Sequence, residues 1–137
     1  MHLYSQEIIE RSRDNRGNGT LEQPTHQGIS HNLLCGDRVH WTLEVQCGMI
    51  IQAKYQTKGC ALCKASSSFL WEQIQLQHID HVKQQIPVFC NVIDNMSKGI
   101  DIQKEEIYVF RDIRYAPLRK NCICLPWDGL FQILEQK

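Results

Sequence analysis

Three of the seven cysteines in this 137-residue chain, together with one aspartate, have types and positions that suit metal or sulfur chemistry. Cys35, Cys60 and Cys122 each stand where a predicted structural element begins or ends. Asp37 follows Cys35 by two residues, so in extended backbone the two side chains point the same way. Three sulfurs and a carboxylate oxygen are enough for a tetrahedral Zn²⁺ or for the irons of a small cluster. We therefore expect Cys35, Asp37, Cys60 and Cys122 to meet at one metal site.

Two of these cysteines are in a context that favours the thiolate, the form that binds metal and attacks sulfur. Cys60 and Cys122 each open a predicted helix, where unpaired backbone N–H groups lower a cysteine pKa below its free value of about 8.5. Arg119 and Lys120 shortly precede Cys122. We expect these two cations to offset the negative charge that three thiolates and a carboxylate leave around Zn²⁺.

A second grouping of cysteines gives an alternative site. Cys60-x-x-Cys63 and Cys122-x-Cys124 have spacings that could make a four-cysteine structural zinc site without Cys35. A redox role for Cys60 and Cys63 lacks the surrounding βαβ pattern that is typical of thioredoxin-like proteins. The spacing alone leaves the choice between the two zinc sites open.

Other residues with reactive side chains have simpler interpretations. Cys90 lies in an apolar run and is interpreted as a small buried hydrophobe. Cys47 is interpreted as an exposed thiol without a role, and the run 66–68 of three serines, which has no evident base partner, as a small-residue helix surface.

Length and charge limit the class of protein. A chain of this length predicts one compact domain, residues 1–137. Lys plus Arg and Asp plus Glu number 15 each, so no net field draws the chain onto nucleic acid or an anionic membrane. Residues 1–19 are polar, with no apolar run typical of a signal peptide, so we expect a cytoplasmic protein. Thiols are reduced there, and seven cysteines then indicate metal or sulfur chemistry rather than disulfides.

The elements that position these residues follow from periodicity. Residues 3–13 predict a short helix, and residues 14–27 a loop or irregular edge strand. Apolar residues alternate from Val39 to Val45 and again from Ile51 to Tyr55, which predicts a hairpin that turns at residues 47–48.

Helical spacing follows the hairpin. One helix is predicted from Cys60 to Ile74, a second over residues 80–93 with an interruption or kink at Pro87, a third over 103–114, and a last one that starts between residues 122 and 126. The expected fold class is α+β, a single domain with a small antiparallel sheet covered by helices.

Three separated motifs resemble the U-type iron–sulfur assembly proteins, which include IscU, SufU and the N-terminal domain of NifU. The motifs are Asn32-Leu33-Leu34-Cys35-Gly36-Asp37-Arg38, Gly59-Cys60-Ala61-Leu62 with Lys64-Ala65-Ser66, and Pro117-Leu118-Arg119-Lys120-Asn121-Cys122. The long stretch between Cys60 and Cys122 resembles SufU. Asn121 stands where IscU-type proteins carry histidine and SufU-type proteins usually carry lysine.

The resemblance implies a three-stranded antiparallel sheet packed against helices (SufE/NifU-like) and a Zn²⁺ held by Cys35, Asp37, Cys60 and Cys122, with Arg119 beside it. It also implies that Cys35 accepts persulfide sulfur from a pyridoxal-phosphate cysteine desulfurase of the SufS type and serves downstream cluster assembly proteins. The chain would then be at most a sulfurtransferase. One alternative is a scaffold that assembles a labile [2Fe–2S] cluster, or holds iron, on the same residues. Another is a structural zinc adaptor.

Overall fold

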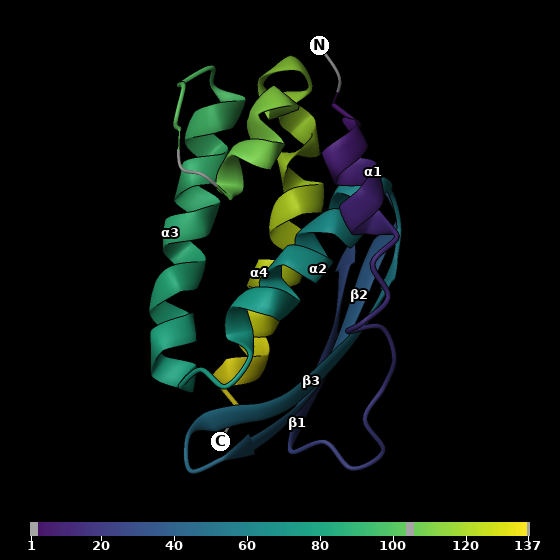
Figure 1. Cartoon of the computed structure of the whole chain (residues 1–137), viewed down its shortest axis with the longest axis vertical. Helices are drawn as coiled ribbons and strands as arrows, with labels where there is room; N and C mark the ends of the chain where they lie inside the picture. The colour runs from purple at the N-terminus through teal and green to yellow at the C-terminus, as the bar shows by residue number, and fades with distance from the viewer. Residues whose placement is uncertain (1–2, 104–105, 137) are drawn as a thin grey trace.

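A three-stranded antiparallel sheet and the helices on one of its faces make up the fold (Figure 1). The structure, a computed structural model, describes residues 3–103 and 106–136. The strand order β1-β2-β3 follows the chain, and the predicted α+β class is confirmed. The elements are α1 (Gln6–Ser12), β1 (His26–Asn32), β2 (Asp37–Gln46), β3 (Met49–Lys58), α2 (Ala61–Ile74), α3 (Ile79–Ser97), the 3-10 helices η1 (Ile107–Tyr115) and η2 (Pro117–Arg119), and α4 (Lys120–Leu134).

The β2–β3 hairpin forms as its alternation predicts. Val39, Trp41 and Leu43 are fully buried on the face that the helices cover. Cys47 and Gly48 turn the chain with φ of 52° and 77°. Two positive φ angles suit the right-handed twist of a two-residue hairpin, although a cysteine is an unusual residue in the first position.

The first strand, β1, is the element that the residue pattern does not predict. It pairs antiparallel with β2, from His26 opposite Leu43 to Asn32 opposite Asp37. Its residues alternate only between half-buried and exposed because it is a polar edge strand. The apolar alternation that identifies β2 and β3 is therefore weak here, whereas the family resemblance does imply this third strand.

The helices form two layers on the sheet. Helices α2 and α4 lie on its inner face, and α3 packs against α4 on the side away from the sheet (Figure 1). Four aromatic side chains fill the space between the layers, and Phe89 stacks on Trp127 with ring centroids 3.6 Å apart. Phe69 and Phe110 complete this cluster. The core therefore lies in the middle of the molecule and reaches across α2, α3, α4 and η1.

Several helix bounds differ from the prediction. Helix α3 continues past Pro87 without a break and ends at Ser97. The segment predicted as an α-helix over 103–114 contains η1 instead, and residues 104–105 of that prediction lie outside the described residues. Ile107, Phe110 and Ile113 recur every three residues, which is the period of a 3-10 helix. Helix α4 begins at Lys120, before the predicted start.

The serine run is buried, so its interpretation as a helix surface is wrong. Ser66, Ser67 and Ser68 all have no exposed surface. The Ser66 hydroxyl donates to the Ile123 carbonyl and accepts from Trp127 Nε1 at 2.9 Å. Buried hydroxyls are stable only with such partners. The small side chain of Ser66 therefore lets α4 approach α2 closely, whereas Ser67 and Ser68 hydrogen-bond to Thr57 and Asp14.

Over the described part of the chain, no helix combines the length and the apolar character needed to cross a bilayer.

Candidate metal centre

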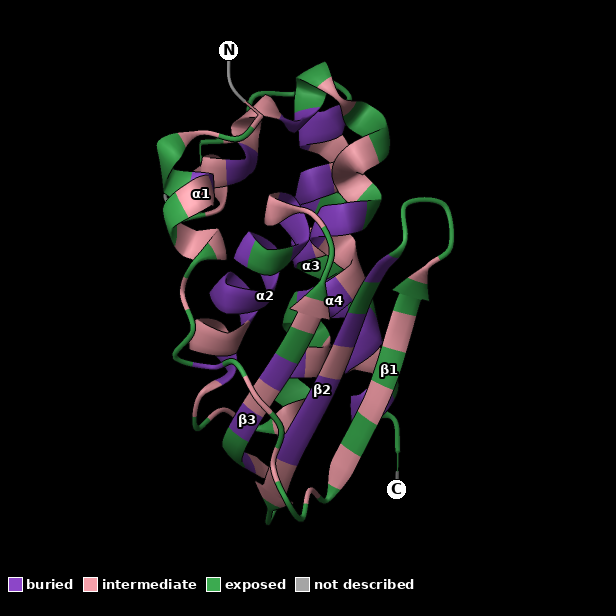
Figure 2. Cartoon of the chain, turned by 90° about the vertical axis from the view of Figure 1, so that its right-hand side faces the viewer, coloured by how far each residue is buried: buried purple, intermediate pink, exposed green. Residues whose placement is uncertain are grey.

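Four side chains from separate parts of the sequence meet at one end of the sheet. Cys35 lies in the loop between β1 and β2, which extends beyond the sheet and is exposed (Figure 2). Asp37 is the first residue of β2, and Cys60 caps the start of α2 after β3. Cys122 lies in the first turn of α4. Strand and helix ends therefore bring together residues that are up to 87 positions apart.

The distances suit a single small metal ion. The sulfurs of Cys35 and Cys122 are 3.7 Å apart. Two sulfurs bound to one tetrahedral Zn²⁺ at about 2.3 Å each lie about 3.8 Å from one another. One ligand atom from each of Cys35, Asp37 and Cys122 lies within 4.8 Å of the others. Cys60 stands at the margin of this group, with its sulfur 4.0 Å from Asp37 Oδ2.

The donor set also suits zinc by its chemistry. Thiolates and one carboxylate are ordinary Zn²⁺ ligands, and four of them complete a tetrahedral shell. The residues present therefore fit the predicted ion. Their service as ligands remains a prediction.

Asp37 is held in place by the chain that it contacts. Its side chain is 2% exposed, and Oδ1 accepts a hydrogen bond from the Cys60 backbone N–H at 3.2 Å. Gly59 allows this approach, because a Cβ at that position would overlap Asp37 Oδ1. The local sequence Gly59-Cys60 thus fixes the carboxylate and the thiol relative to one another.

A hydrogen bond between the side chains of Cys60 and Cys122 shifts their pKa values in opposite directions. A hydrogen bond from the Cys122 thiol is the main cause that lowers the pKa of Cys60 to about 5, and the Cys63 backbone N–H and Arg119 add to it against the effect of burial. The same hydrogen bond to Cys60, together with burial, raises the pKa of Cys122. In the metal-free site this hydrogen bond therefore favours a thiolate on Cys60 over one on Cys122.

Arg119 is the cation of this centre. It ends η2 beside Cys60, and its guanidinium also donates to the Tyr4 hydroxyl and lies over the Tyr4 ring. Tyr4 is a contact that the sequence analysis did not single out, because its partner is 115 positions away. The expectation for Lys120 is wrong. Its ammonium donates to Asp94 Oδ1 at 2.6 Å, which joins α4 to α3 instead.

The alternative four-cysteine site does not assemble. Cys63 has no exposed surface and packs in the core, where burial is the main cause that raises the pKa of its thiol. Cys124 lies beside Cys90, away from Cys60 and Cys122. Cys90 itself is half-buried and 3.7 Å from Asp128 Oδ1, so its interpretation as a fully buried hydrophobe holds only in part. Within residues 3–103 and 106–136, the group around Cys35 is the one set of three potential ligands at metal-binding distances.

The accessibility of the sulfurs differs within the centre. Cys35 is exposed and Cys122 is 2% exposed behind it. Leu33 and Leu34, which precede Cys35 in the loop, are each 92% exposed. A reagent or partner that approaches this end of the molecule therefore meets Cys35 first, next to two apolar side chains.

The chain is similar to proteins of one family over nearly its whole length. The profile of the NifU-like N-terminal domain family matches residues 3–124. The iron–sulfur cluster assembly scaffold protein IscU of Thermotoga maritima is 26% identical, with 98% of this chain and 94% of that protein covered. The zinc-dependent sulfurtransferase SufU of Bacillus subtilis is 24% identical, with 93% and 86% covered.

A solved structure has the same fold. A proposed iron–sulfur cluster assembly scaffold protein of the SUF system from Fervidobacterium islandicum AW-1 superposes with a TM-score of 0.81 at 28% identity, and the alignment covers 97% of each chain.

Proposed function

The chain belongs to the NifU-like N-terminal domain family, and from this premise we propose that it is a zinc-binding sulfur carrier of iron–sulfur cluster assembly. In this proposal Cys35, Asp37, Cys60 and Cys122 bind Zn²⁺. Cys35 accepts persulfide sulfur from a pyridoxal-phosphate cysteine desulfurase, and downstream assembly proteins receive it. The whole of residues 1–137 acts as one assembly domain.

The observation that carries the proposal is the pair of sulfurs 3.7 Å apart, one exposed on Cys35 and one buried on Cys122. Bound Zn²⁺ keeps its cysteine ligands deprotonated at neutral pH. Three buried or half-buried groups, Asp37, Cys60 and Cys122, hold the inner side of the site. Cys35 lies on a loop and is the ligand most easily released when a partner docks.

The transfer step is an exchange between sulfurs. The Cys35 thiolate attacks the outer sulfur of the desulfurase persulfide, and a new S–S bond forms on Cys35. The S–S bond within the donor breaks, and the desulfurase cysteine leaves as a thiolate. Arg119 lies beside Cys60, where its charge offsets the anionic sulfurs that remain in the site.

A cysteine substitution tests the proposal. With a SufS-type desulfurase and free cysteine, we expect Cys35→Ala to lose all sulfur acceptance, measured as the mass added to the protein by persulfide sulfur. Circular dichroism should show an intact fold, because Cys35 is exposed. Cys47→Ala, which removes an exposed thiol in the β2–β3 turn, is the matched control and should accept sulfur normally. Transfer to Cys35→Ala at the wild-type rate would exclude this role.

The main alternative is a scaffold for a [2Fe–2S] cluster on the same residues. The similarity to the Thermotoga IscU supports it. Anaerobic reconstitution with iron and sulfide separates the two functions. A stable visible chromophore would favour the scaffold, whereas tight stoichiometric zinc without a chromophore would favour the carrier.

A structural zinc adaptor is the third candidate, and chelation tests it. A structural ion contributes folding free energy, so its removal unfolds the domain. The aromatic core around Phe89 and Trp127 is built without residues of the metal centre. We therefore expect chelation to leave most of the helix and sheet signal intact.

A further inference from the structure

The solvent face of the sheet carries a row of cationic side chains directly behind the metal centre. Arg38 and Lys58 are opposite each other in the β2–β3 pairing, and His31 is opposite Arg38 in the β1–β2 pairing. All three residues are exposed. Arg38 follows Asp37, and Lys58 is followed by Gly59 and Cys60. We call Arg38 and Lys58 the cationic row.

Repulsion between the two cations of this row destabilises the free protein. Like charges directly opposite each other in neighbouring strands destabilise a sheet. Arg38 and Lys58 face each other in this way, and neither forms an ion pair with a carboxylate of residues 3–103 or 106–136. Elsewhere cations do form such pairs, as Arg11 does with Glu72 and Lys83 with Glu135. Repulsion between Arg38 and Lys58 is therefore left uncompensated at this point of the surface.

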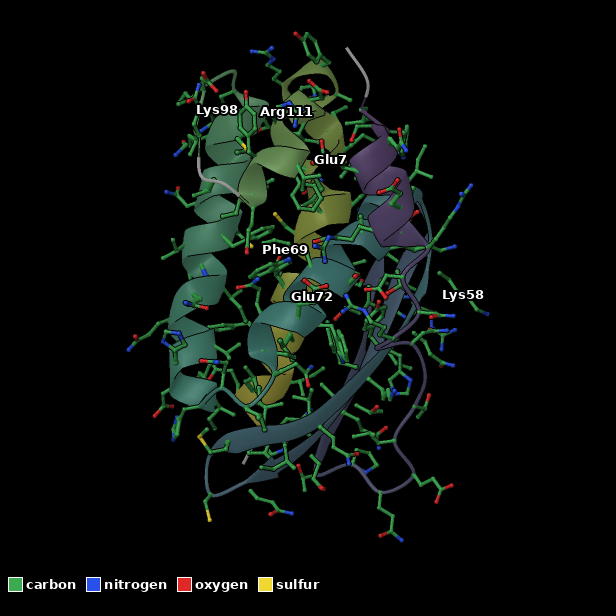
Figure 3. All side chains as sticks on the ribbon, in the orientation of Figure 1. Glu7, Lys58, Phe69, Glu72, Lys98 and Arg111 are labelled. Carbon is green, nitrogen blue, oxygen red and sulfur yellow. The ribbon has the colours of Figure 1, made fainter. Side chains whose placement is uncertain are left out.

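The side chains of this face enclose a small hollow of hydrogen-bond donors. Arg38, His40, Gln56 and Lys58 line a cavity of about 110 Å³. Guanidinium, amide and ammonium groups all donate to oxygen anions, and the guanidinium can do so with two parallel bonds. Figure 3 shows the Lys58 side chain directed away from the helices and into solvent. The nearest acidic side chain by sequence, Asp37, is buried on the side of the metal centre.

The position of the hollow next to the Cys35 loop indicates what kind of anion would bind there. Between His31 and Arg38 the chain forms the loop that carries Leu33, Leu34 and Cys35. The row adjoins this loop, so a protein that covers the loop to reach the Cys35 sulfur can also contact this end of the sheet. Because the whole chain has no net charge, attraction of such a partner depends on a local patch rather than on the overall field.

We propose that the cationic row docks an acidic surface segment, rich in Asp and Glu, of the protein that exchanges sulfur with Cys35. This inference rests on the proposed function. The exposed leucines would supply the apolar part of the same interface, and Arg38 with Lys58 its charge complementarity and its rate of association.

A peptide titration tests the acidic recognition alone. Hexaglutamate added to the ¹⁵N-labelled, zinc-loaded protein at 50 mM NaCl should shift the backbone amides of Arg38, His40, Gln56 and Lys58. These shifts should vanish at 500 mM NaCl, because exposed charges are screened. They should also vanish in the Arg38→Gln/Lys58→Gln double variant. Absence of the shifts, or their persistence in that variant, would overturn the proposal.

The matched control removes the same charge elsewhere. The Lys83→Gln/Lys98→Gln variant removes one cation within α3 and one at its C-terminal end, both of which form ion pairs. The peptide shifts at the sheet should remain in this variant. The Arg38→Gln/Lys58→Gln variant should be at least as stable as the wild type, since it removes a repulsive pair. A clear loss of stability would instead assign the row a structural role.

A kinetic measurement connects the row to sulfur transfer. With a SufS-type desulfurase, the double variant should raise the concentration of protein at half-maximal transfer about tenfold at low salt, with the maximal rate unchanged. An unchanged half-maximal concentration would contradict docking at this face. Zinc content and the peptide shifts do not require desulfurase activity, so failure of the proposed function and failure of this inference are distinguishable.

Discussion

Cys60 and Cys63 are separated by one turn of α2 but belong to two different regions of the molecule. Cys60 faces the metal centre at the end of the sheet, among Asp37, Cys122 and Arg119. Cys63 packs in the core, which continues through the aromatic cluster to α3. The first region gathers anionic groups, whereas the second excludes water. The same residue type therefore serves two purposes because of what surrounds it.

The two regions also differ in what stabilises them. In the core, apolar burial and hydroxyls bonded to backbone carbonyls favour the folded state. At the metal centre a buried carboxylate and neighbouring thiols are brought together, and burial disfavours each charge. A bound cation removes that penalty. The core thus provides the free energy of folding, and this free energy holds the groups of the metal centre together.

The largest expected effect is on the core. Phe89→Ala removes a ring that is 3% exposed and stacked on Trp127, so it should lower the free energy of unfolding by about 3–5 kcal/mol. Urea unfolding followed by circular dichroism measures this loss. Val88→Ala, at a position 56% exposed on the same helix, is the control and should change stability little. If both variants are equally stable, the aromatic cluster does not dominate the core.

The second effect contrasts Cys60, the N-cap of α2, with Cys63 in the first turn of that helix. In metal-free protein at pH 7, iodoacetamide should modify Cys60 at least about a hundredfold faster than Cys63, because the pKa of Cys60 is lowered and that of Cys63 is raised. The thiolate fraction of Cys60 should fall as the pH drops through about 5. Mass spectrometry of peptides resolves the two sites. Equal rates would remove the contrast between the regions.

A third effect isolates the glycine that lets Asp37 approach. Gly59→Ala places a methyl group where Asp37 Oδ1 lies and should weaken zinc binding by about tenfold or more, measured by competition with a chelator. Gly99→Ala is a matched control, since Gly99 also has a positive φ but no atom near its added Cβ. Zinc affinity that falls equally in both variants would indicate a general loss of stability rather than displacement of the carboxylate.

Much of the fold was predictable where one physical signal dominated. The period-two apolar pattern identified β2 and β3, and helical spacing located α2 and α3. The edge strand β1 was not predictable from pattern because most of its residues are polar and none of them is fully buried. The repeat of Ile107, Phe110 and Ile113 contains the 3-10 period of η1, but a spacing of three residues also suits an α-helix and does not by itself distinguish the two.

The convergence of the candidate ligands was predictable in outline more than in detail. Cys35, Asp37, Cys60 and Cys122 stand at element ends, and such ends converge at one edge of a sheet. What the sequence could not supply was the direction of neighbouring side chains. Tertiary packing directs Lys120 to Asp94 on another helix, and the burial of Ser66 depends on how closely α4 approaches α2.

The smallest expected effect tests that reassignment of Lys120. Its pairing with Asp94 lies outside the metal centre and is solvent-accessible, so Lys120→Gln should leave zinc affinity within about twofold of the wild type. Lys98→Gln removes the other cation that pairs with Asp94 and should behave the same way. Arg119→Gln, in contrast, removes the charge beside Cys60 and should weaken zinc binding measurably. If Lys120→Gln lowers the affinity as much as Arg119→Gln, the two cations act together on the thiolates, and the boundary between the regions is less sharp than the contacts of Lys120 indicate.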